Sequence, residues 1–505
     1  MMCADYVTTG GSMINKLIFL FNVMFSVVFS WILVLLTDKM IKGSILTIVF
    51  LIATLIILAI FLKKTPKKMT DKDYKRAWMV VQAISAIMMV IIAFGLEVMF
   101  SWDWGQLIIT ATHFVETGEI DKVYYYARYP NNQFWLMILI WLFKFIKIFI
   151  PSADIEVFKN ISIIWSCAFV QLTIWLIYRT ARHVWNEKKA FLTGLMAVVC
   201  LPLYLFAQYA YTDTSGMFAG ALMIYLYVKM RKSAGMKKKG YLFLLGLAAV
   251  LTYEIKVTVF IVFIAVIADS ITRIKSVREY LIKVAVVTAA LIIAITTIGQ
   301  VVSLNIKIDK EVADNYKFPL THWVMMALNE QGGYSQADVD FTASKHTYED
   351  KKEANVQEIK SRIKNFGALG LVKHIGYTKM IRTWGYGSLC GDDYVNRYPL
   401  DVDGMWYNLF AHGGKNNTFS QIYMQIYHFV LIMGILLSAV LSIRRKKEEQ
   451  GLLITRIATF GLMLFMCIWE CNARYLVAML PVLIMTSADG LFMLSERLQK
   501  IEVKK

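Results

Sequence analysis

Charged residues are scarce in this chain. Asp, Glu, Lys and Arg make up 18% of its 505 residues, and hydrophobic residues make up 58%. Soluble domains hold about 25% charged and roughly 45–50% apolar residues. The mean hydropathy of +0.53 therefore excludes a soluble protein of several domains. At least ten stretches reach the ~17–25 apolar residues that a helix needs to cross a bilayer. We predict an all-α polytopic membrane protein.

Motifs for several chemistries are also absent. The sequence has no Walker phosphate loop, dinucleotide fingerprint, HExxH or Cys/His metal spacing. These absences exclude ATP-driven and zinc-hydrolase activities. The six cysteines do not make a disulfide framework, since four of them fall within apolar segments. The first apolar run lacks a small-residue cleavage site, so we expect it to stay as a membrane anchor.

Basic residues cluster in short loops. Segment 63–76 alone carries seven Lys or Arg and two Asp, and the net charge of the chain is +18. Segment 304–420, by contrast, holds fourteen basic and fourteen acidic residues. Basic short loops mark the cytoplasmic side of a membrane protein. The excess charge therefore reflects topology and fits anionic lipid headgroups, and we expect no nucleic-acid partner.

This charge pattern predicts a multi-pass protein of the cell membrane with both termini in the cytoplasm and about 11–13 crossings. The number of membrane crossings is inconsistent in one part of the chain. Three apolar segments lie between the basic loops 63–76 and 179–189, where an even number of crossings is needed. One of the three must be a half-span, or the basic rule fails at one loop. The loops expected outside are 101–131, 208–212, 304–420 and 470–472.

Four parts follow along the chain: two N-terminal helices with a basic loop (1–76), a transmembrane core (77–303), an outer loop or lid (304–420) and C-terminal helices with a cytoplasmic tail (421–505). In the lid, apolar residues at helical spacing predict an amphipathic helix that ends at Gly367 and a second one over 369–384. Helices of this kind lie on a membrane surface or cap a cavity. We find no internal repeat.

Polar residues interrupt the expected outer ends of several helices. Asp103, in Ser-Trp-Asp-Trp-Gly, follows an apolar span directly. It suits two roles, a cap for the next helix or a general base at the membrane surface. Lys256 interrupts an apolar run and either pairs with Glu254 or faces a phosphate. Asp213 opens another helix, for which an N-cap is a sufficient explanation.

The outer turn 469–475 contains a second acid and cation. Glu470 and Arg474 are four residues apart, so they either pair with each other or leave Arg474 free to clamp a lipid phosphate. A planar guanidinium that stays protonated suits phosphate oxygens. Tyr475 follows directly. His322, early in the long loop, either joins this site or lies on the surface.

Arg128, Tyr129 and Asn131 surround Pro130 at the start of another apolar helix. Proline in a first helical turn, with asparagine beside it, is also ordinary helix-start chemistry.

Taken together, these motifs resemble the GT-C superfamily of membrane glycosyltransferases, near its protein O-mannosyltransferase and aminoarabinose-transferase branch. Two features depart from that pattern. The apolar segments 15–36 and 44–62 precede the usual first helix, and the first-loop motif carries one acid in place of an Asp-Glu pair. The matching motifs are Asp103, Tyr-Pro-Asn-Asn at 129–132, Tyr-Thr-Asp at 211–213, Lys256, His322-Trp323 and Trp-Glu…Arg-Tyr at 469–475.

The resemblance implies a GT-C-type helical bundle and an enzyme, a hexosyl- or pentosyltransferase. Such an enzyme moves a sugar, with inversion, from a polyprenyl-phosphate donor to an extracytoplasmic acceptor. That acceptor is a cell-wall polysaccharide, a teichoic acid, a lipid or a protein. In this scheme Asp103 is the catalytic base. The donor-phosphate ligands are Arg474, Lys256, Tyr475 and His322. The acceptor-binding or accessory residues are Asp213, Arg128, Tyr129, Asn131 and Glu470.

Other functions stay open. A polysaccharide polymerase or ligase also uses lipid-linked donors, but moves a whole oligosaccharide. A transporter or flippase also has many helices, but usually shows internal repeats. A membrane scaffold would leave the acid and cation pattern without a purpose. We assign no cofactor. A divalent cation shared by Asp103 and Asp213 is an alternative, although two isolated carboxylates are a poor metal signature.

Overall fold

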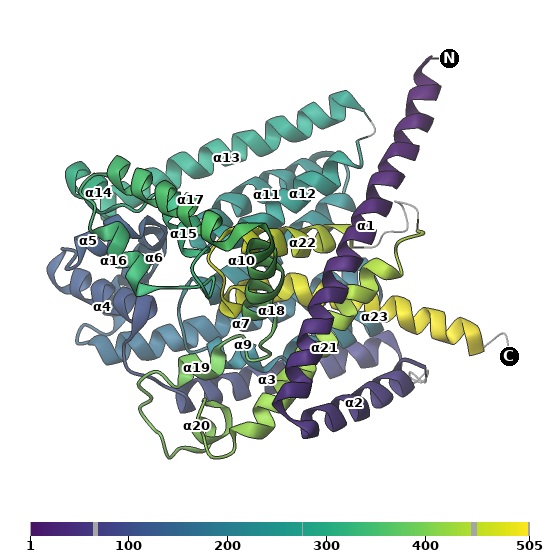
Figure 1. The fold of residues 1–505 in the computed structure, drawn as a ribbon, viewed down its shortest axis with the longest axis horizontal. Coiled ribbons are helices and arrows are strands. Elements are labelled where there is room, and N and C mark those ends of the chain that lie inside the picture. The colour runs from purple at the N-terminus through teal and green to yellow at the C-terminus, as the bar shows by residue number, and fades with distance from the viewer. Residues whose placement is uncertain (1, 64–68, 275, 446–451, 503–505) are drawn as a thin grey trace.

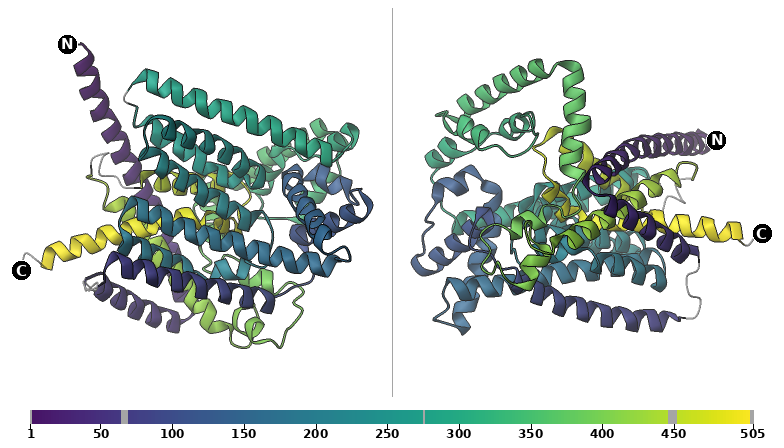
Figure 2. Two further views of the ribbon diagram at one scale, coloured as in Figure 1. Left: turned by 180° about the vertical axis from the view of Figure 1, so that it is seen from behind. Right: turned by 60° about the horizontal axis from the view of Figure 1, so that its bottom comes forward.

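The computed structural model describes residues 2–63, 69–274, 276–445 and 452–502. Within these ranges the chain folds into helices and forms no β-strand, which confirms the predicted all-α class. Most long helices run along the horizontal axis of Figure 1, and short helices gather at its left end, here named the loop end. The N- and C-terminal helices both project from the opposite end, here named the terminal end (Figures 1 and 2).

The longer helices are α1 (Met2–Gly43), α2 (Ile45–Lys63), α3 (Asp71–Gly95), α4 (Trp102–Thr117), α6 (Gln133–Phe149), α7 (Ile155–Val184), α10 (Thr212–Arg231), α11 (Gly235–Ile255), α13 (Val277–Asn305), α17 (Tyr348–Lys373), α21 (Asn417–Val440), α22 (Leu453–Ile468) and α23 (Leu480–Glu502). The shorter helices are α5 (Val123–Arg128), η1 (Pro130–Asn132), α8 (Glu187–Val198), α9 (Leu201–Phe206), η2 (Val257–Phe260), α12 (Ile261–Ile271), α14 (Lys310–Tyr316), α15 (Leu320–Met326), α16 (Gln336–Ala343), η3 (His374–Lys379), α18 (Met380–Trp384), α19 (Gly391–Val395), α20 (Met405–Phe410) and η5 (Ala473–Met479).

In the described part of the chain, eight helical segments are long and apolar enough to cross a membrane. Two further apolar helices, Val257–Ile271 and Leu453–Ile468, are shorter. These numbers follow from length and composition, so the expected 11–13 crossings stay a prediction. The eight segments are Met13–Gly43, Ile45–Lys63, Asp71–Gly95, Pro130–Phe149, Ile155–Val184, Val277–Asn305, Asn417–Val440 and Ala473–Lys500.

Helices α3 and α7 are antiparallel neighbours. Near the start of α3, the Trp78 ring stacks on the Tyr178 ring of α7, with centroids 4.5 Å apart. Just beyond the end of α3, the Glu97 carboxylate pairs with the Lys159 ammonium of α7 at 3.2 Å. The chain therefore leaves α3 and enters α7 at the same end of the bundle.

Helix α6, which lies between them in the sequence, consequently does not cross the bundle. It begins next to Asn132, whose side-chain amide donates to the Tyr125 hydroxyl of loop 101–131 at 2.9 Å. It ends just before α7 begins. Of the two alternatives that the basic loops leave open, this arrangement favours a half-span, and α6 is the segment that fits it, even though its composition would let it cross a membrane. With α3 and α7 as the crossings, the number between the two basic loops is even.

Helix α10 packs tightly at the centre of the bundle because two of its residues lack side chains. A Cβ atom on Gly216 would lie 3.4 Å from the Cβ of Lys256, and one on Gly220 would lie 3.0 Å from Val259. Both neighbours belong to the α11–η2 junction. This close approach brings the first turn of α10, which carries Asp213, against Lys256.

Residues 306–416, here named the lid, connect α13 to α21. The predicted helix end at Gly367 is confirmed as a kink within α17: its φ of +60° and ψ of 178° are not helical, and two helical stretches meet there. Glycine adopts this conformation without steric penalty. Beyond the kink the chain runs to α18, where the Trp384 ring meets the Phe29 ring of α1 edge-on at 5.5 Å.

The half-span predicts which positions face the same side of the membrane. Cysteines replacing Glu119, in loop 101–131, and Ser152, between α6 and α7, should react from one side. A cysteine replacing Lys232 should react from the other, because the Lys232 ammonium bonds to His183 at the far end of α7. The measurement is labelling of intact and permeabilised cells with a membrane-impermeant maleimide in a cysteine-free background. Reaction of position 152 from the side of position 232 would contradict the half-span.

Candidate active site

Four segments far apart in the sequence meet in one site: the start of α4, the start of α10, the α11–η2 junction and the start of η5. Trp102, the first residue of α4, has φ of +43°. For a bulky side chain such a backbone costs on the order of 1–3 kcal/mol and persists only where its surroundings hold it. The Trp102 ring is held edge-on against Tyr211 at 4.9 Å and Tyr394 at 5.0 Å. Contacts with other segments thus maintain the strained start of α4.

The half-buried Asp103 carboxylate accepts two hydrogen bonds. The Tyr125 hydroxyl donates to Oδ1 at 2.5 Å, and the Tyr211 hydroxyl donates to Oδ2 at 3.1 Å. Burial, followed by the Asp103 charge, raises the pKa of Tyr125, so its hydroxyl remains a protonated donor at neutral pH. A carboxylate has about four acceptor positions, so Asp103 can accept from a further hydroxyl. The helix-cap alternative is wrong, since Ser101 occupies the N-cap position.

The Tyr-Pro-Asn-Asn segment continues this network. Asn132 is buried and donates from its amide to the Tyr125 hydroxyl. Asn131 donates in turn to the side-chain oxygen of Asn132 at 3.2 Å. The predicted residue Asn131 therefore reaches Asp103 only through two intermediaries. Asn132, which the sequence interpretation did not single out, is closer.

Asp213 lies between two cations. Its carboxylate is 2.7 Å from the Lys256 ammonium and 3.7 Å from Nε of Arg474. The side chains of Asp213, Lys256 and Arg474 are 2%, 10% and 12% exposed. Lys256 thus pairs with Asp213 and not with its neighbour Glu254. One carboxylate balances only one of the two cations, so this buried group carries a net positive charge that favours an anionic ligand.

Aromatic rings fix the position of the Arg474 guanidinium. Its central carbon lies 5.0 Å from the Tyr394 ring and 5.2 Å from the Trp102 ring. The Tyr211 and Tyr475 rings also lie within 6.0 Å. Its Nη1 donates to the Tyr394 hydroxyl at 2.5 Å. Cation–π contacts strengthen where water is excluded, so this cage holds the charge in one place.

Tyr211 connects the acid to the cations. Its hydroxyl bonds to Asp103, while its ring faces Arg474. The Asp103 carboxylate and the Arg474 guanidinium therefore border the same tyrosine, and Lys256 joins them through Asp213, which faces both cations. The sequence motifs of loop 101–131, helix α10 and the turn 469–475 belong to one site.

Glu470 takes a different partner from the one its spacing indicates. It is 4% exposed and accepts a hydrogen bond from the Tyr475 hydroxyl at 2.7 Å. In the part of the chain that the structure describes, it forms no ion pair with Arg474. Burial raises the pKa of Glu470, which favours its neutral form. Arg474 is consequently free to face Asp213 and a ligand.

His322 is not brought to the cations. It is fully buried in the lid, where its Nδ1 bonds to the Thr342 hydroxyl at 2.7 Å and its ring packs 4.4 Å from Phe318. Burial lowers the pKa of His322 to about 4, so the imidazole is neutral at physiological pH. A neutral side chain in the interior of the lid does not suit the predicted role of phosphate ligand.

Arg128 and Tyr129 contact the lid instead of the cations. The Arg128 guanidinium lies over the Phe318 ring at 4.9 Å, and the Tyr129 ring lies 6.2 Å from Trp323. Trp323 stacks in turn on Trp469, with centroids 6.0 Å apart. These rings join loop 101–131, the lid and the turn 469–475.

Besides Asn132, the sequence interpretation missed four residues that shape the site: Trp102, Tyr125, Tyr211 and Tyr394. The first three stand within or beside the motifs that were singled out, and a hydroxyl or ring next to a buried charge is a usable signal. Tyr394 lies in the lid, on α19, and no local pattern marks it.

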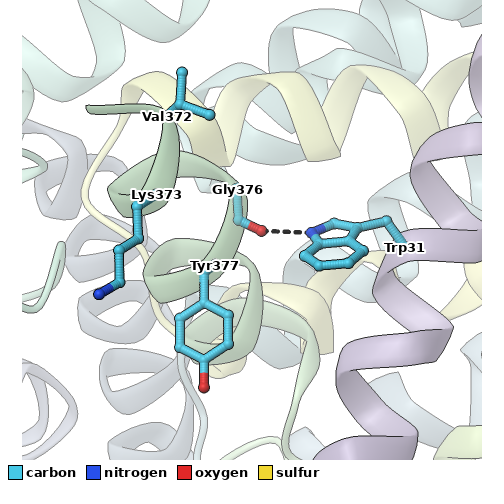
Figure 3. Close-up of a pocket in the computed structure, with 5 residues that line it drawn as sticks. All are labelled: Trp31, Val372, Lys373, Gly376 and Tyr377. Atoms are coloured by element: carbon cyan, nitrogen blue, oxygen red, sulfur yellow. Dashed lines mark hydrogen bonds between the residues drawn. The ribbon is translucent and has the colours of Figure 1, made fainter. Parts of the chain in front are cut away.

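A separate groove of about 350 Å³ lies between α1 and the lid (Figure 3). Its lining residues are Trp31, Val372, Lys373, Gly376 and Tyr377. The Trp31 indole donates to the Gly376 carbonyl at 2.7 Å and ties the groove walls together (Figure 3). None of the predicted site residues lines it.

A metal ion shared by Asp103 and Asp213 does not fit this geometry. Asp213 already faces two protein cations, and Asp103 accepts two hydroxyl hydrogen bonds. Divalent cations in proteins gather several oxygen ligands, which these two carboxylates do not share.

The fold and the site define a class: a helical membrane protein with a buried acid and cation cluster at the loop end of its bundle. The chain belongs to the family described as conserved hypothetical integral membrane protein, whose model matches residues 7–490. No curated protein matches the sequence.

Among solved structures, the chain is similar to the Archaeoglobus fulgidus oligosaccharyltransferase tethered with an acceptor peptide (14% identity, TM-score 0.41) and to AglB from the same organism with an inhibitory peptide and a dolichol-phosphate (14%, 0.44). It is also similar to ArnT from Cupriavidus metallidurans bound to undecaprenyl phosphate (9%, 0.35). The matches cover 84%, 85% and 82% of this chain, and 51%, 51% and 78% of the other chains.

At identities of 14% or lower, these similarities concern the fold alone. The chain spans about half the length of the archaeal oligosaccharyltransferase chains. All three TM-scores lie below 0.5, so the chain's own side chains carry the functional proposal.

The charge balance around Asp213 leads to a stability prediction. Asp213→Ala leaves two buried cations without a counter-charge, and breaking such a group costs about 3–5 kcal/mol. We expect a lower melting temperature in detergent, measured by scanning fluorimetry. Glu119→Ala, at an exposed acid of loop 101–131, should melt like the wild type. Adding Lys256→Met to Asp213→Ala should restore part of the loss, and equal melting of Asp213→Ala and wild type would contradict the pairing.

Buried His322 predicts that acid loosens the lid. Its pKa is about 4 in the folded chain and 6.5 when free. The folded lid therefore has the full contribution of neutral His322 above pH 6.5 and loses it as the pH falls from 6.5 towards 4. Hydrogen exchange of α15–α17 at pH 7 and pH 5 measures this change. His322→Phe should show a smaller acid response, and an unchanged response would remove His322 as its source.

Proposed function

We propose that the protein is a membrane glycosyltransferase that moves a single sugar, a hexose or a pentose, from a polyprenyl-phosphate donor to an acceptor hydroxyl on the extracytoplasmic side. One observation carries this proposal. An accessible carboxylate and a buried group of net positive charge border one tyrosine in a chain built of membrane helices. Acceptor activation and leaving-group stabilisation need these two features side by side.

The donor's chemistry accounts for the location. A polyprenyl tail is too apolar to leave the bilayer, and a sugar phosphate is too polar to enter it. A transfer site for such a molecule must therefore lie near the end of a helical bundle. The energy for transfer resides in the bond between sugar and phosphate, so the enzyme needs no nucleotide-binding motif.

The residues divide the reaction between them. The acceptor hydroxyl gives its proton to the Asp103 carboxylate as its oxygen attacks the anomeric carbon of the donor. The bond between that carbon and the phosphate oxygen breaks, and the electron pair leaves with the lipid phosphate. Arg474 and Lys256 stabilise the charge that develops on this phosphate. Asp213 and the aromatic cage hold both cations in place, and attack opposite the leaving group inverts the anomeric centre.

Tyr125 and Tyr211 set the orientation of the base. Both donate to Asp103, so two of its acceptor positions are occupied and the carboxylate is held in place. A productive complex requires the acceptor hydroxyl to occupy one of the remaining acceptor positions. Glu470 and Tyr475 form a separate hydrogen-bonded pair. In this scheme that pair stabilises the turn 469–475, which carries Arg474.

The test is transfer by purified protein from a panel of polyprenyl-phosphate sugars, measured as release of polyprenyl phosphate. Asp103→Asn should lower turnover by about 10²–10⁴-fold, the usual contribution of a general base. Binding of the lipid donor should persist, since the cations are intact. Glu119→Gln, at an exposed acid of the same loop, is the control and should keep full turnover.

Two outcomes would count against this function. Equal turnover by Asp103→Asn and wild type would remove Asp103 from the reaction. Transfer of whole oligosaccharides, with no reaction of single-sugar donors, would favour a polymerase or ligase.

A further inference from the structure

The lid carries a second group of potential ligands, on α19 and the segment after α20. One ligand atom each from Asp392, Asp393 and His412 lies within 4.8 Å of the others. Nδ1 of His412 is 4.0 Å from Oδ2 of Asp392. These side chains belong to neither the Asp103 network nor the Asp213 group.

Asp392 has an oxygen that no protein group satisfies. Its side chain is only 9% exposed. Oδ2 accepts a hydrogen bond from the Gln421 amide at 2.8 Å, but the buried Oδ1 has no hydrogen-bond partner among the described residues. A buried carboxylate oxygen without a partner is costly, and a bound cation removes that cost.

The neighbouring charges do not supply this cation. The Lys39 ammonium of α1 lies over the Tyr386 ring. In the described ranges it forms no ion pair with either carboxylate.

The backbone holds these residues together in advance. The His412 amide donates to the Asp392 carbonyl at 3.1 Å, which fixes the two segments to each other. Just before α19, Leu389 and Cys390 have φ of +52° and +66°. Consecutive non-glycine residues in the left-handed region are strained, and such strain concentrates at functional sites.

We propose that Asp392, Asp393 and His412 bind a divalent transition-metal cation. Two carboxylates and one imidazole suit Zn²⁺ or Mn²⁺ better than Mg²⁺ or Ca²⁺, which prefer all-oxygen ligands. The ion neutralises the paired acids and fixes α19. Tyr394, the next residue on that helix, accepts from Arg474. The bound cation is thus a positioning element for the Arg474 cage, and its binding does not depend on the proposed transfer reaction.

The test is metal binding by the full-length protein, without a polyhistidine tag, after chelator treatment in detergent. Calorimetric titration with Zn²⁺ and electron paramagnetic resonance titration with Mn²⁺ should each show one site. Asp393→Asn and His412→Gln should weaken that site at least about tenfold. Both positions are exposed, so these variants should fold, which circular dichroism checks. Asp403→Asn, at an exposed acid of the same segment, should bind like the wild type.

Other results would overturn the site. Absence of stoichiometric binding by the wild type would do so, as would unchanged binding in both ligand variants. Loss of binding in Asp103→Asn, with Asp393→Asn unaffected, would place the cation in the active site instead. Because each result is read as metal bound, it is distinguishable from a failure of the transfer assay.

Discussion

The pairing of one buried carboxylate, Asp213, with two cations is the interaction on which the loop end of the bundle depends. Removing a charge from water costs several kcal/mol unless a partner compensates it. Asp213 compensates only one charge of Lys256 and Arg474, so the group holds a positive charge in a setting of low dielectric, where an anion is bound strongly. The packing of α10 makes this possible, because Gly216 and Gly220 let its first turn approach the α11–η2 junction.

Aromatic side chains turn this charge group into a site with a defined geometry. Tyr211 donates a hydrogen bond to Asp103 through its hydroxyl, and its ring faces Arg474. Tyr211 therefore fixes the position of the Asp103 carboxylate relative to the Arg474 guanidinium. Trp102 fills the space beside them at the expense of a strained backbone. Tyr394 reaches the same guanidinium from the lid. The lid thus contributes directly to the site, and its own order, including the proposed metal site on α19, bears on how Arg474 is held.

Much of the architecture could be predicted from local patterns. Long apolar runs predicted the helical membrane class, and the basic loops indicated either a half-span between residues 77 and 189 or a failure of the basic rule at one loop. They could not say which segment it was, because α6 is apolar enough to cross. The tertiary contacts of Trp78 with Tyr178 and of Glu97 with Lys159 show that α3 ends and α7 begins at the same end of the bundle. The expected helix end at Gly367 was visible in the sequence, and its non-helical φ and ψ separate two helical stretches there.

For the site, residue types and their place at helix ends were enough to select Asp103, Asp213, Lys256 and Arg474, because a charge beside an apolar span needs an explanation. Their ion-pair and hydrogen-bond partners could not be predicted from the sequence. Glu254 and Glu470 were the nearest acids along the chain, yet Lys256 and Arg474 face Asp213, and Glu470 bonds to Tyr475. The imidazole of His322 suits a phosphate ligand by residue type, but it is buried inside the lid. Sequence alone determined which elements are apolar and where charges stand relative to them, since both depend on neighbours along the chain. Which charges meet was decided by tertiary packing, since it depends on how closely α10, η2 and η5 approach one another.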